Sequence, residues 1–199
     1  MSNAILKISA AVLIIASAAG WWFGAYLPFQ KSKRFIEVIR SGSVIKTIDE
    51  LERRFNAVLD FYSPVGEAEA IGFFADQMVN VLGTKPPADV GERLIAYTEE
   101  KARPVLENPE SPELTKVFLK VASLNEVGWI IYQKEEYFRR AENYLLEGLK
   151  ISPNRPQYLY GLFNLYASVG DRERVKAIGE EILRFWPNDE VMRAKVSLL

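Results

Sequence analysis

The sequence predicts an all-α protein in which one apolar amino-terminal helix precedes a superhelix of helical hairpins. An uncharged, largely apolar run extends from Ile8 to Phe29. Near the carboxyl terminus, two helical segments that each end in a proline are related by one fixed shift along the chain. No stretch between these segments alternates apolar and polar residues as a half-buried strand does. These three observations favour helices throughout the chain.

The apolar run has the length of a transmembrane helix. A helix of about 20 residues crosses the roughly 30 Å of hydrocarbon in a bilayer. Trp21, Trp22 and Tyr26 lie near the end of the run, where aromatic side chains favour the membrane–water interface. Residues 1–30 are therefore predicted to be a single-pass anchor that contacts the membrane through residues 8–29.

A cleaved signal peptide is the alternative to an anchor. Ala16-Ser17-Ala18 has the small residues of a cleavage site, and Lys7 gives a basic start. The residues that follow this site continue the apolar run, which suits a stop-transfer helix better. We therefore favour the anchor, and leave cleavage open.

The orientation of the anchor has conflicting signals. Lys31, Lys33, Arg34 and Arg40 follow the span and only Lys7 precedes it, so the positive-inside rule places the larger part in the cytoplasm. A short leading segment with one basic residue is instead usual for an export anchor. If the helix were the last of several, its direction would be set upstream. We predict an extracytoplasmic soluble part.

Two further features accompany the anchor. Ala16, Gly20 and Gly24 share one helix face, which permits close contact with a partner helix, although small residues are common in membrane helices generally. Lys31, Lys33 and Arg34 are predicted to flank the membrane, either as a plain anchor or as a site for anionic lipid head groups.

The residues from 31 to 121 read as a divergent helical region. Apolar residues recur with helical spacing, and Gly, Pro and Ser clusters separate the segments. The predicted helices are Gln30–Arg40, Val44–Phe61, Ala68–Leu82 and Asp89–Leu106. Pro104 is expected to distort the last turn of the fourth helix.

A recurrence of landmark residues begins after this region. Each of four landmarks returns at the same shift: Ala141, Leu145, Gly148 and Pro153 recur as Val175, Gly179, Ile182 and Pro187. A fixed period of about 34 residues is typical of stacked helix–turn–helix units. If Ala122 opens one unit, Pro156 opens the next.

These two units resemble the tetratricopeptide repeat (TPR) family. The bulky and small residues at positions seven, eight and eleven are Gly128, Trp129 and Tyr132, then Leu162, Phe163 and Tyr166. The second copy departs from the family at Gly179 and Ile182, where an aromatic residue and an alanine are usual. The resemblance covers residues 122–189. It implies that the earlier helices are degenerate members of the same stack and that residues 190–199 form a capping helix.

The resemblance also implies a binding face. In the family, positions two, five, nine and twelve of each first helix line a concave groove for a protein or peptide. The matching residues here are Ser123, Glu126, Ile130, Gln133, Gln157, Tyr160, Asn164 and Ala167. Asn164 matches an asparagine of members that clamp a terminal carboxylate. Tyr160 replaces the lysine of that clamp, so a mixed polar and aromatic groove is expected instead.

Composition excludes several function classes. The chain has no histidine and no cysteine, so it lacks the side chains of a Ser–His–Asp triad, a thiolate nucleophile or a usual zinc site. Only an all-carboxylate metal or acid–base site stays open. The chain has 25 Lys and Arg residues and 26 Asp and Glu residues. It therefore lacks the basic excess that is typical of a nucleic-acid-binding protein. We expect no enzymatic activity, no cofactor, no metal and no nucleic-acid partner.

A second resemblance concerns the junction between the anchor and the repeats. The string AYLPFQKSKRFIEVIRSG, followed by helical repeats, is similar to the carboxyl-terminal end of O-antigen ligase or polymerase membrane proteins that carry TPRs. This resemblance implies an alternative function, as an accessory or carboxyl-terminal part of a surface-polysaccharide assembly protein.

Overall fold

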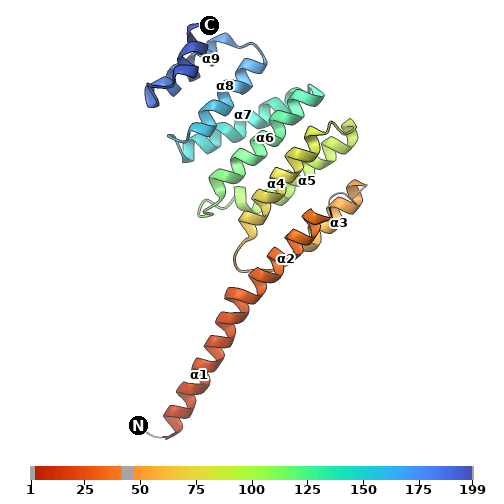
Figure 1. The fold of residues 1–199 in the computed structure, drawn as a ribbon, viewed down its shortest axis with the longest axis vertical. Coiled ribbons are helices and arrows are strands. Elements are labelled where there is room, and N and C mark those ends of the chain that lie inside the picture. The colour runs from red at the N-terminus through yellow and green to blue at the C-terminus, as the bar shows by residue number, and fades with distance from the viewer. Residues whose placement is uncertain (1–2, 42–46, 199) are drawn as a thin grey trace. The chain divides into compact units, whose positions relative to one another are not determined.

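The computed structural model describes residues 3–41 and 47–198, and every regular element in these two ranges is a helix. The prediction of an all-α protein is therefore confirmed for the described residues (Figure 1). The chain divides into two compact units, Met1–Ile71 and Gly72–Leu199, and the boundary falls within one helix. The helices are α1 Asn3–Trp21, η1 Trp22–Tyr26, α2 Leu27–Arg40, α3 Ile48–Leu59, α4 Glu67–Gly83, α5 Ala88–Leu106, α6 Leu114–Tyr132, α7 Glu135–Ile151, α8 Pro156–Ser168, α9 Arg172–Phe185 and α10 Glu190–Ser197.

The first three elements form one unbroken helix, Asn3–Arg40, that is long and apolar enough to cross a membrane, as a signal sequence or a core helix also is. Every residue from Asn3 to Ala25 is exposed, so this part of the helix packs against nothing in the described chain. The sequence predicts a continuous helix from the apolar run into Arg40, and the structure confirms it.

A single π-helical turn interrupts the α-helical hydrogen bonding of this long helix. In η1, the Leu27 N–H donates to the carbonyl of Trp22, five residues earlier. The next residue, Pro28, has no N–H to offer the carbonyl of Gly24, and its ring crowds that carbonyl. The wider turn accommodates the proline without breaking the helix. Pro28 is therefore the physical cause of η1.

Helix α2 joins the packed part of the first unit from its first residue. Leu27, Lys31 and Phe35 are buried, and they lie four apart on one face of α2, which packs against α3. The Phe35 and Phe55 rings meet edge to face with centroids 6.3 Å apart. The packed region thus begins inside the apolar run, before the predicted anchor boundary at residue 30.

Helix α3 is shorter than predicted. The sequence suggests a helix over Val44–Phe61, whereas α3 runs from Ile48 to Leu59; positions 44–46 lie outside the described residues. Thr47 caps the amino end by accepting a hydrogen bond from the Glu50 N–H at 3.2 Å.

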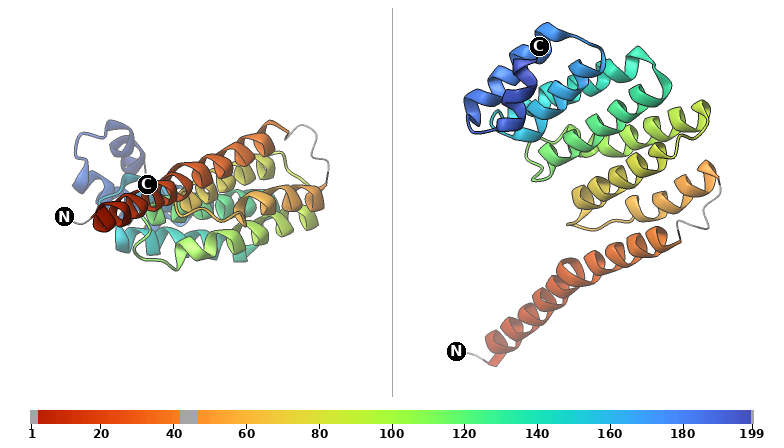
Figure 2. Two further views of the ribbon diagram at one scale, coloured as in Figure 1. Left: turned by 90° about the horizontal axis from the view of Figure 1, so that it is seen from below. Right: turned by 45° about the horizontal axis from the view of Figure 1, so that its top comes forward.

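The second unit is a stack of antiparallel helices, which Figures 1 and 2 show in successive layers. Helix α5 packs on α6, α6 on α7, α7 on α8, α8 on α9, and α9 on α10. Phe74 of α4 meets Tyr97 of α5 edge to face at 5.4 Å, and Asp76 of α4 forms an ion pair with Lys120 of α6. The coarse prediction of stacked helical hairpins is confirmed in this unit.

Polar side chains tie α5, α6 and α7 together inside this stack. The Glu99 carboxylate accepts hydrogen bonds from Asn125 Nδ2 at 2.8 Å and from Arg140 at 3.0 Å. Tyr144 of α7 also hydrogen-bonds to Glu99. Asn125 is fully buried, and its second amide hydrogen bond goes to the Val121 carbonyl at 3.0 Å. Glu99 of α5 thus links side chains of α6 and α7.

The recurrence seen in the sequence appears as repeated backbone geometry. Ser152, the residue after α7, has φ −135° and ψ 73°, and Trp186, the residue after α9, has φ −126° and ψ 75°. In each case the N–H donates to the carbonyl four residues earlier, Gly148 or Ile182. Pro153 and Pro187 follow in matching exposed turns. The two proline-terminated hairpins are therefore structurally equivalent at their carboxyl ends.

At two equivalent buried positions, the sizes of the side chains differ between the repeats. The Tyr158 ring packs so closely on Gly148 that a Cβ there would lie 2.1 Å from its Cε1 atom. One repeat later the corresponding pair is Met192 and Ile182, both fully buried. A small residue thus faces a large one in the first repeat, and two residues of medium size occupy these positions in the second.

The first helix of the first repeat begins earlier than the sequence predicts. Helix α6 begins at Leu114, two turns before Ala122, whereas α8 begins at Pro156 as predicted. The extra turns are held by Leu114, Val117 and Phe118, which are buried. Helix α10 starts at Glu190, where the capping helix is predicted.

Candidate partner-binding face

The predicted groove residues lie on α6 and α8, which are neighbours in the stack. None of them belongs to the core, because each is exposed or half-buried. The same positions continue one repeat further into α10, as Val191, Ala194 and Leu198. We call the combined set the first-helix face; its members are Ser123, Glu126, Ile130, Gln157, Tyr160, Asn164, Val191, Ala194 and Leu198.

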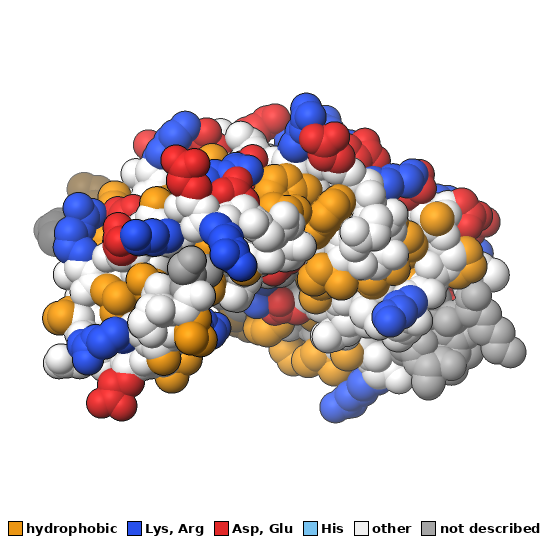
Figure 3. Space-filling view, turned by 90° about the horizontal axis from the view of Figure 1, so that it is seen from above, with side chains coloured by type: hydrophobic (Ala, Val, Ile, Leu, Met, Phe, Trp, Pro, Cys, Tyr) orange, Lys and Arg blue, Asp and Glu red, His pale blue; other side chains and the backbone are white. Residues whose placement is uncertain are grey.

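The α10 part of the first-helix face is unusually apolar for an exposed surface. Val191 is 68% exposed and Leu198 is 86% exposed. The sequence predicts this helix as a cap, and a further step of the same period from Gln157, Tyr160 and Asn164 identifies these positions. On the side of the molecule in Figure 3, acidic and basic side chains are interspersed and apolar side chains are exposed between them.

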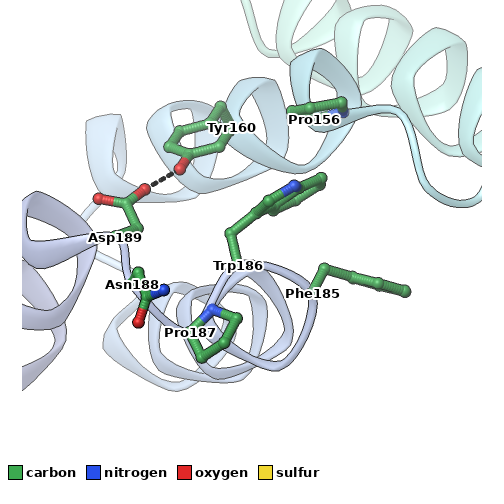
Figure 4. A pocket seen from close by; sticks show the side chains of 7 residues that line it. All are labelled: Pro156, Tyr160, Phe185, Trp186, Pro187, Asn188 and Asp189. Carbon is green, nitrogen blue, oxygen red and sulfur yellow. Dashed lines mark hydrogen bonds between the residues drawn. The ribbon is translucent and has the colours of Figure 1, made fainter.

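A pocket of about 470 Å³ lies where the start of α8 meets the turn from α9 into α10. Its walls are mainly aromatic and proline side chains, and its lining residues are Pro156, Tyr160, Phe185, Trp186, Pro187, Asn188 and Asp189. Figure 4 shows Trp186 reaching from the turn toward Pro156, and the Tyr160 hydroxyl pointing at Asp189. Tyr160 is the one predicted groove residue in this lining. For the other lining residues, the sequence signal is the aromatic pair Phe185-Trp186, which directly precedes Pro187.

A hydrogen bond between Tyr160 and Asp189 fixes the polar edge of this pocket. The Tyr160 hydroxyl donates to Asp189 Oδ2, and the Met192 N–H donates to Asp189 Oδ1 at 2.9 Å. These hydrogen bonds hold the pKa of Asp189 below its ordinary value, with the Tyr160 hydroxyl as the larger cause. Burial, helped by the Asp189 carboxylate, raises the pKa of Tyr160 to about 12. At neutral pH the pocket therefore presents one carboxylate and one neutral phenol.

Glu126 occupies the position of Tyr160 one repeat earlier. Within residues 3–41 and 47–198, its half-buried carboxylate has neither a hydrogen bond nor an ion pair, and burial raises its pKa. The residue that matches Asp189 is Arg155, but its guanidinium donates instead to Thr115 Oγ1 at 2.5 Å. Glu126 is therefore a carboxylate on the first-helix face that lacks a cation.

The remaining predicted groove residues have simpler surroundings. Gln133 ends α6 in the left-handed conformation with φ 54°, and its Nε2 donates to the carbonyls of Trp129 and Ile130, both at 3.1 Å. Its amide is thus engaged by its own helix. Ser123, Gln157 and Asn164 are exposed.

The structure separates the three predicted membrane-flanking residues. Lys31 is only 3% exposed, and it lies within electrostatic reach of Asp60 and Glu67. Lys33 and Arg34 are exposed, and the Arg34 guanidinium lies 4.2 Å from the centroid of the Phe61 ring. The position of Lys31 between Leu27 and Phe35 on one helix face is the sequence signal for its burial.

The stripe of small residues on the long helix is open. Ala16, Gly20 and Gly24 are exposed, and an added Cβ at Gly20 or Gly24 would meet no atom within 4 Å. Among the described residues, no group of three or more acidic side chains gathers as a metal-binding cluster. In the described part of the chain, the pocket at Tyr160 and the first-helix face are candidates for partner binding.

Comparison with known proteins gave no match for this chain among family models, curated proteins or solved structures.

Proposed function

We propose that this protein is a membrane-anchored scaffold of the TPR type, whose first-helix face holds an extended segment of a partner protein. The observation that carries the proposal is the aromatic pocket at Tyr160 and Trp186, which lies on a repeated helical framework. Aromatic and proline side chains offer rigid apolar surface that loses little conformational entropy when a peptide binds.

The chemistry of the face defines the kind of segment. The pocket suits an apolar side chain, because only its edge at Asp189 is charged. Glu126, one repeat away, offers an unpaired carboxylate to a basic side chain. A carboxylate that is half-buried and unpaired binds a cation more strongly than a fully solvated one does. We therefore expect an extended segment with an apolar residue and a nearby lysine or arginine.

Placement at the membrane follows from the exposed apolar helix. Residues 8–29 contain the predicted span, and the burial of Leu27 limits the part available to lipid to the residues before it. We place the soluble part on the extracytoplasmic side. The basic residues that follow the span favour the opposite orientation under the positive-inside rule. Lys31 is buried beside two carboxylates, so it no longer counts among these exposed basic residues. Protease digestion of intact cells tests this, because an extracytoplasmic soluble part is cleaved and a cytoplasmic one is protected.

Site-specific photo-crosslinking in native membranes tests the partner face. A photoreactive amino acid replaces Gln157, which is exposed next to Pro156 at the pocket. The adduct formed by the full-length chain is expected to disappear in the double variant Tyr160→Ala, Asn164→Ala and to weaken in Glu126→Lys. Tyr160→Phe keeps the ring and is expected to retain the adduct.

The matched control is Asn143→Ala, an exposed asparagine on α7 outside the first-helix face. This variant is expected to give the same adduct as the unaltered chain. An adduct that persists in the double variant would show that the partner binds elsewhere.

The second candidate is a part of a surface-polysaccharide ligase or polymerase. It is favoured by the unbroken helix from Asn3 to Arg40, since the repeats of such proteins directly follow their last membrane helix. On this alternative, a polytopic membrane protein co-purifies with the full chain in equal amounts, and replacing Gly20 and Gly24 with leucine abolishes the association. If no polytopic protein co-purifies, the alternative is rejected.

A further inference from the structure

We infer that the turn between α3 and α4, residues 60–66, is a second membrane contact that lies in the lipid–water interface beside the anchor helix. The inference rests on the proposed anchor, and it adds a surface of the soluble part that meets neutral lipid.

The turn presents apolar side chains outward. Tyr62 is 67% exposed and Val65 is 58% exposed. Between them Ser63 is buried, and its hydroxyl donates to the Val65 carbonyl at 2.6 Å. Gly66, with φ 84°, provides the left-handed residue that turns the chain into α4. The turn is thus held from within while its two apolar side chains face outward.

Contacts with α2 place this turn close to the anchor. Asp60, at the start of the turn, and Glu67, the first residue after it, interact electrostatically with Lys31, and the Arg34 guanidinium lies over the Phe61 ring. Figures 1 and 2 show the connection from α3 to α4 next to the long helix near the beginning of α2. All of these residues belong to the first unit.

The distance along the helix brings the turn to the level of the interface. The rings of Trp21, Trp22 and Tyr26 form an aromatic cluster in which Trp22 and Tyr26 are stacked, and such clusters mark the membrane–water interface in an anchor. Lys31 comes five residues after Tyr26, which is about 7.5 Å along a helix that rises 1.5 Å per residue. The polar zone on each side of the hydrocarbon is roughly 5–8 Å thick. A tyrosine and a valine that extend from the level of Lys31 therefore reach this zone.

Charge at the turn is largely balanced, so the contact does not require an anionic head group. Lys31, Lys33 and Arg34 bring positive charge, but Asp60 and Glu67 offset most of it at the turn itself. Tyrosine at an interface needs no lipid charge, because its ring is apolar and its hydroxyl remains in water. Vesicles of phosphatidylcholine alone are therefore sufficient for the contact.

The absence of cysteine in the chain makes a clean labelling experiment available. The full-length Val65→Cys variant carries a fluorescent probe and is reconstituted into phosphatidylcholine vesicles that contain a lipid with a quencher near its head group. The matched control is Arg40→Cys, at the exposed far end of α2, about 21 Å beyond Tyr26 along the helix. We expect quenching at position 65, little at position 40, and a decrease at position 65 when Tyr62 is replaced by serine.

Flotation of the same vesicles separates this inference from the proposed anchor. If the protein floats with the vesicles but the probe at position 65 is no more quenched than the probe at position 40, the second contact is refuted and the anchor stands. If the protein does not float, the anchor fails and this inference fails with it. Circular dichroism of the Tyr62→Ser variant must match that of the unaltered chain, and quenching that Tyr62→Ser leaves unchanged would also refute the role of Tyr62.

Discussion

Single residues set the tightest constraints in this molecule, and Gly148 is the clearest. Tyr158 is fully buried, its hydroxyl donates to the Thr115 carbonyl, and its ring occupies the space that a Cβ on Gly148 would need. The Tyr158 ring has little room to move, because Leu145 and Leu159 are buried in the same cluster. Any side chain at position 148 therefore overpacks this part of the core.

We predict that Gly148→Ala destabilises the protein. Overpacking of a filled core typically costs about 1–3 kcal/mol, and urea unfolding followed by circular dichroism measures the loss. Gly72→Ala is the control, because a Cβ there meets no atom within 4 Å. That substitution is expected to be neutral or stabilising by up to about 1 kcal/mol, as for other open helical glycines. Equal stability of the two variants would contradict the packing described for Gly148.

Asp189 gives a prediction for pH dependence. Its pKa is lowered from 3.8 in the folded state, first by the Tyr160 hydroxyl and then by the Met192 N–H. A depressed carboxyl pKa stabilises the folded state above the unfolded pKa, and this stability is lost as the pH falls through the folded value. We therefore expect Asp189→Asn to be less stable than the unaltered chain at pH 6 and similar to it below the lowered pKa. A difference that is the same at both pH values would exclude the ionised carboxylate as its cause.

Among whole elements, the helices at the carboxyl end were the most predictable. Pro153 and Pro187 fix the ends of α7 and α9 locally, because proline cannot continue a helix and neighbouring polar residues favour a turn. The start of the first repeat was less predictable. The repeat period places it at Ala122, although a connector that ends at Pro112 lies directly before the start of α6 at Leu114. The burial of Leu114 depends on residues far away in the chain.

The candidate site could be predicted only in part, because the sequence shows the repeat period but not how one helix packs on the next. The position of Tyr160 follows from the repeat period, so sequence reasoning finds it. The role of Trp186 depends on how α9 packs beside α8, which no local pattern encodes. For Lys31 the helix face indicates burial, but its carboxylate neighbours, Asp60 and Glu67, come from a distant part of the chain and could not be predicted.

The π-helical turn supplies a prediction at the level of one element. Pro28→Ala restores an N–H that can donate to the Gly24 carbonyl, so we expect an ordinary α-helix from Trp21 to Phe29. In hydrogen-exchange NMR of the protein in a bilayer mimetic, the new amide at position 28 should be protected. If the Leu27 N–H still bonds to Trp22 in this variant, the stacked aromatic rings, and not the proline, cause the turn.

At the scale of the whole molecule, the exposed helix and the packed helices are separable. Residues 3–25 contribute nothing to the core of the described chain, whereas packing starts at Leu27. Deletion of residues 3–25 is therefore expected to move the protein from the membrane fraction to the soluble fraction and to leave its helical circular dichroism per residue nearly unchanged. Loss of the cooperative thermal transition would show that α1 stabilises the packed part.

The unbroken passage from α1 through η1 into α2 leaves no flexible linker between the exposed helix and the packed part of the first unit. If lipid surrounds α1, thinner or thicker membranes tilt it by different angles. Because Leu27 and Phe35 are buried against their own unit, α2 works as a rigid lever and carries α3 through the same rotation. A linker would absorb that movement, whereas this junction transmits it.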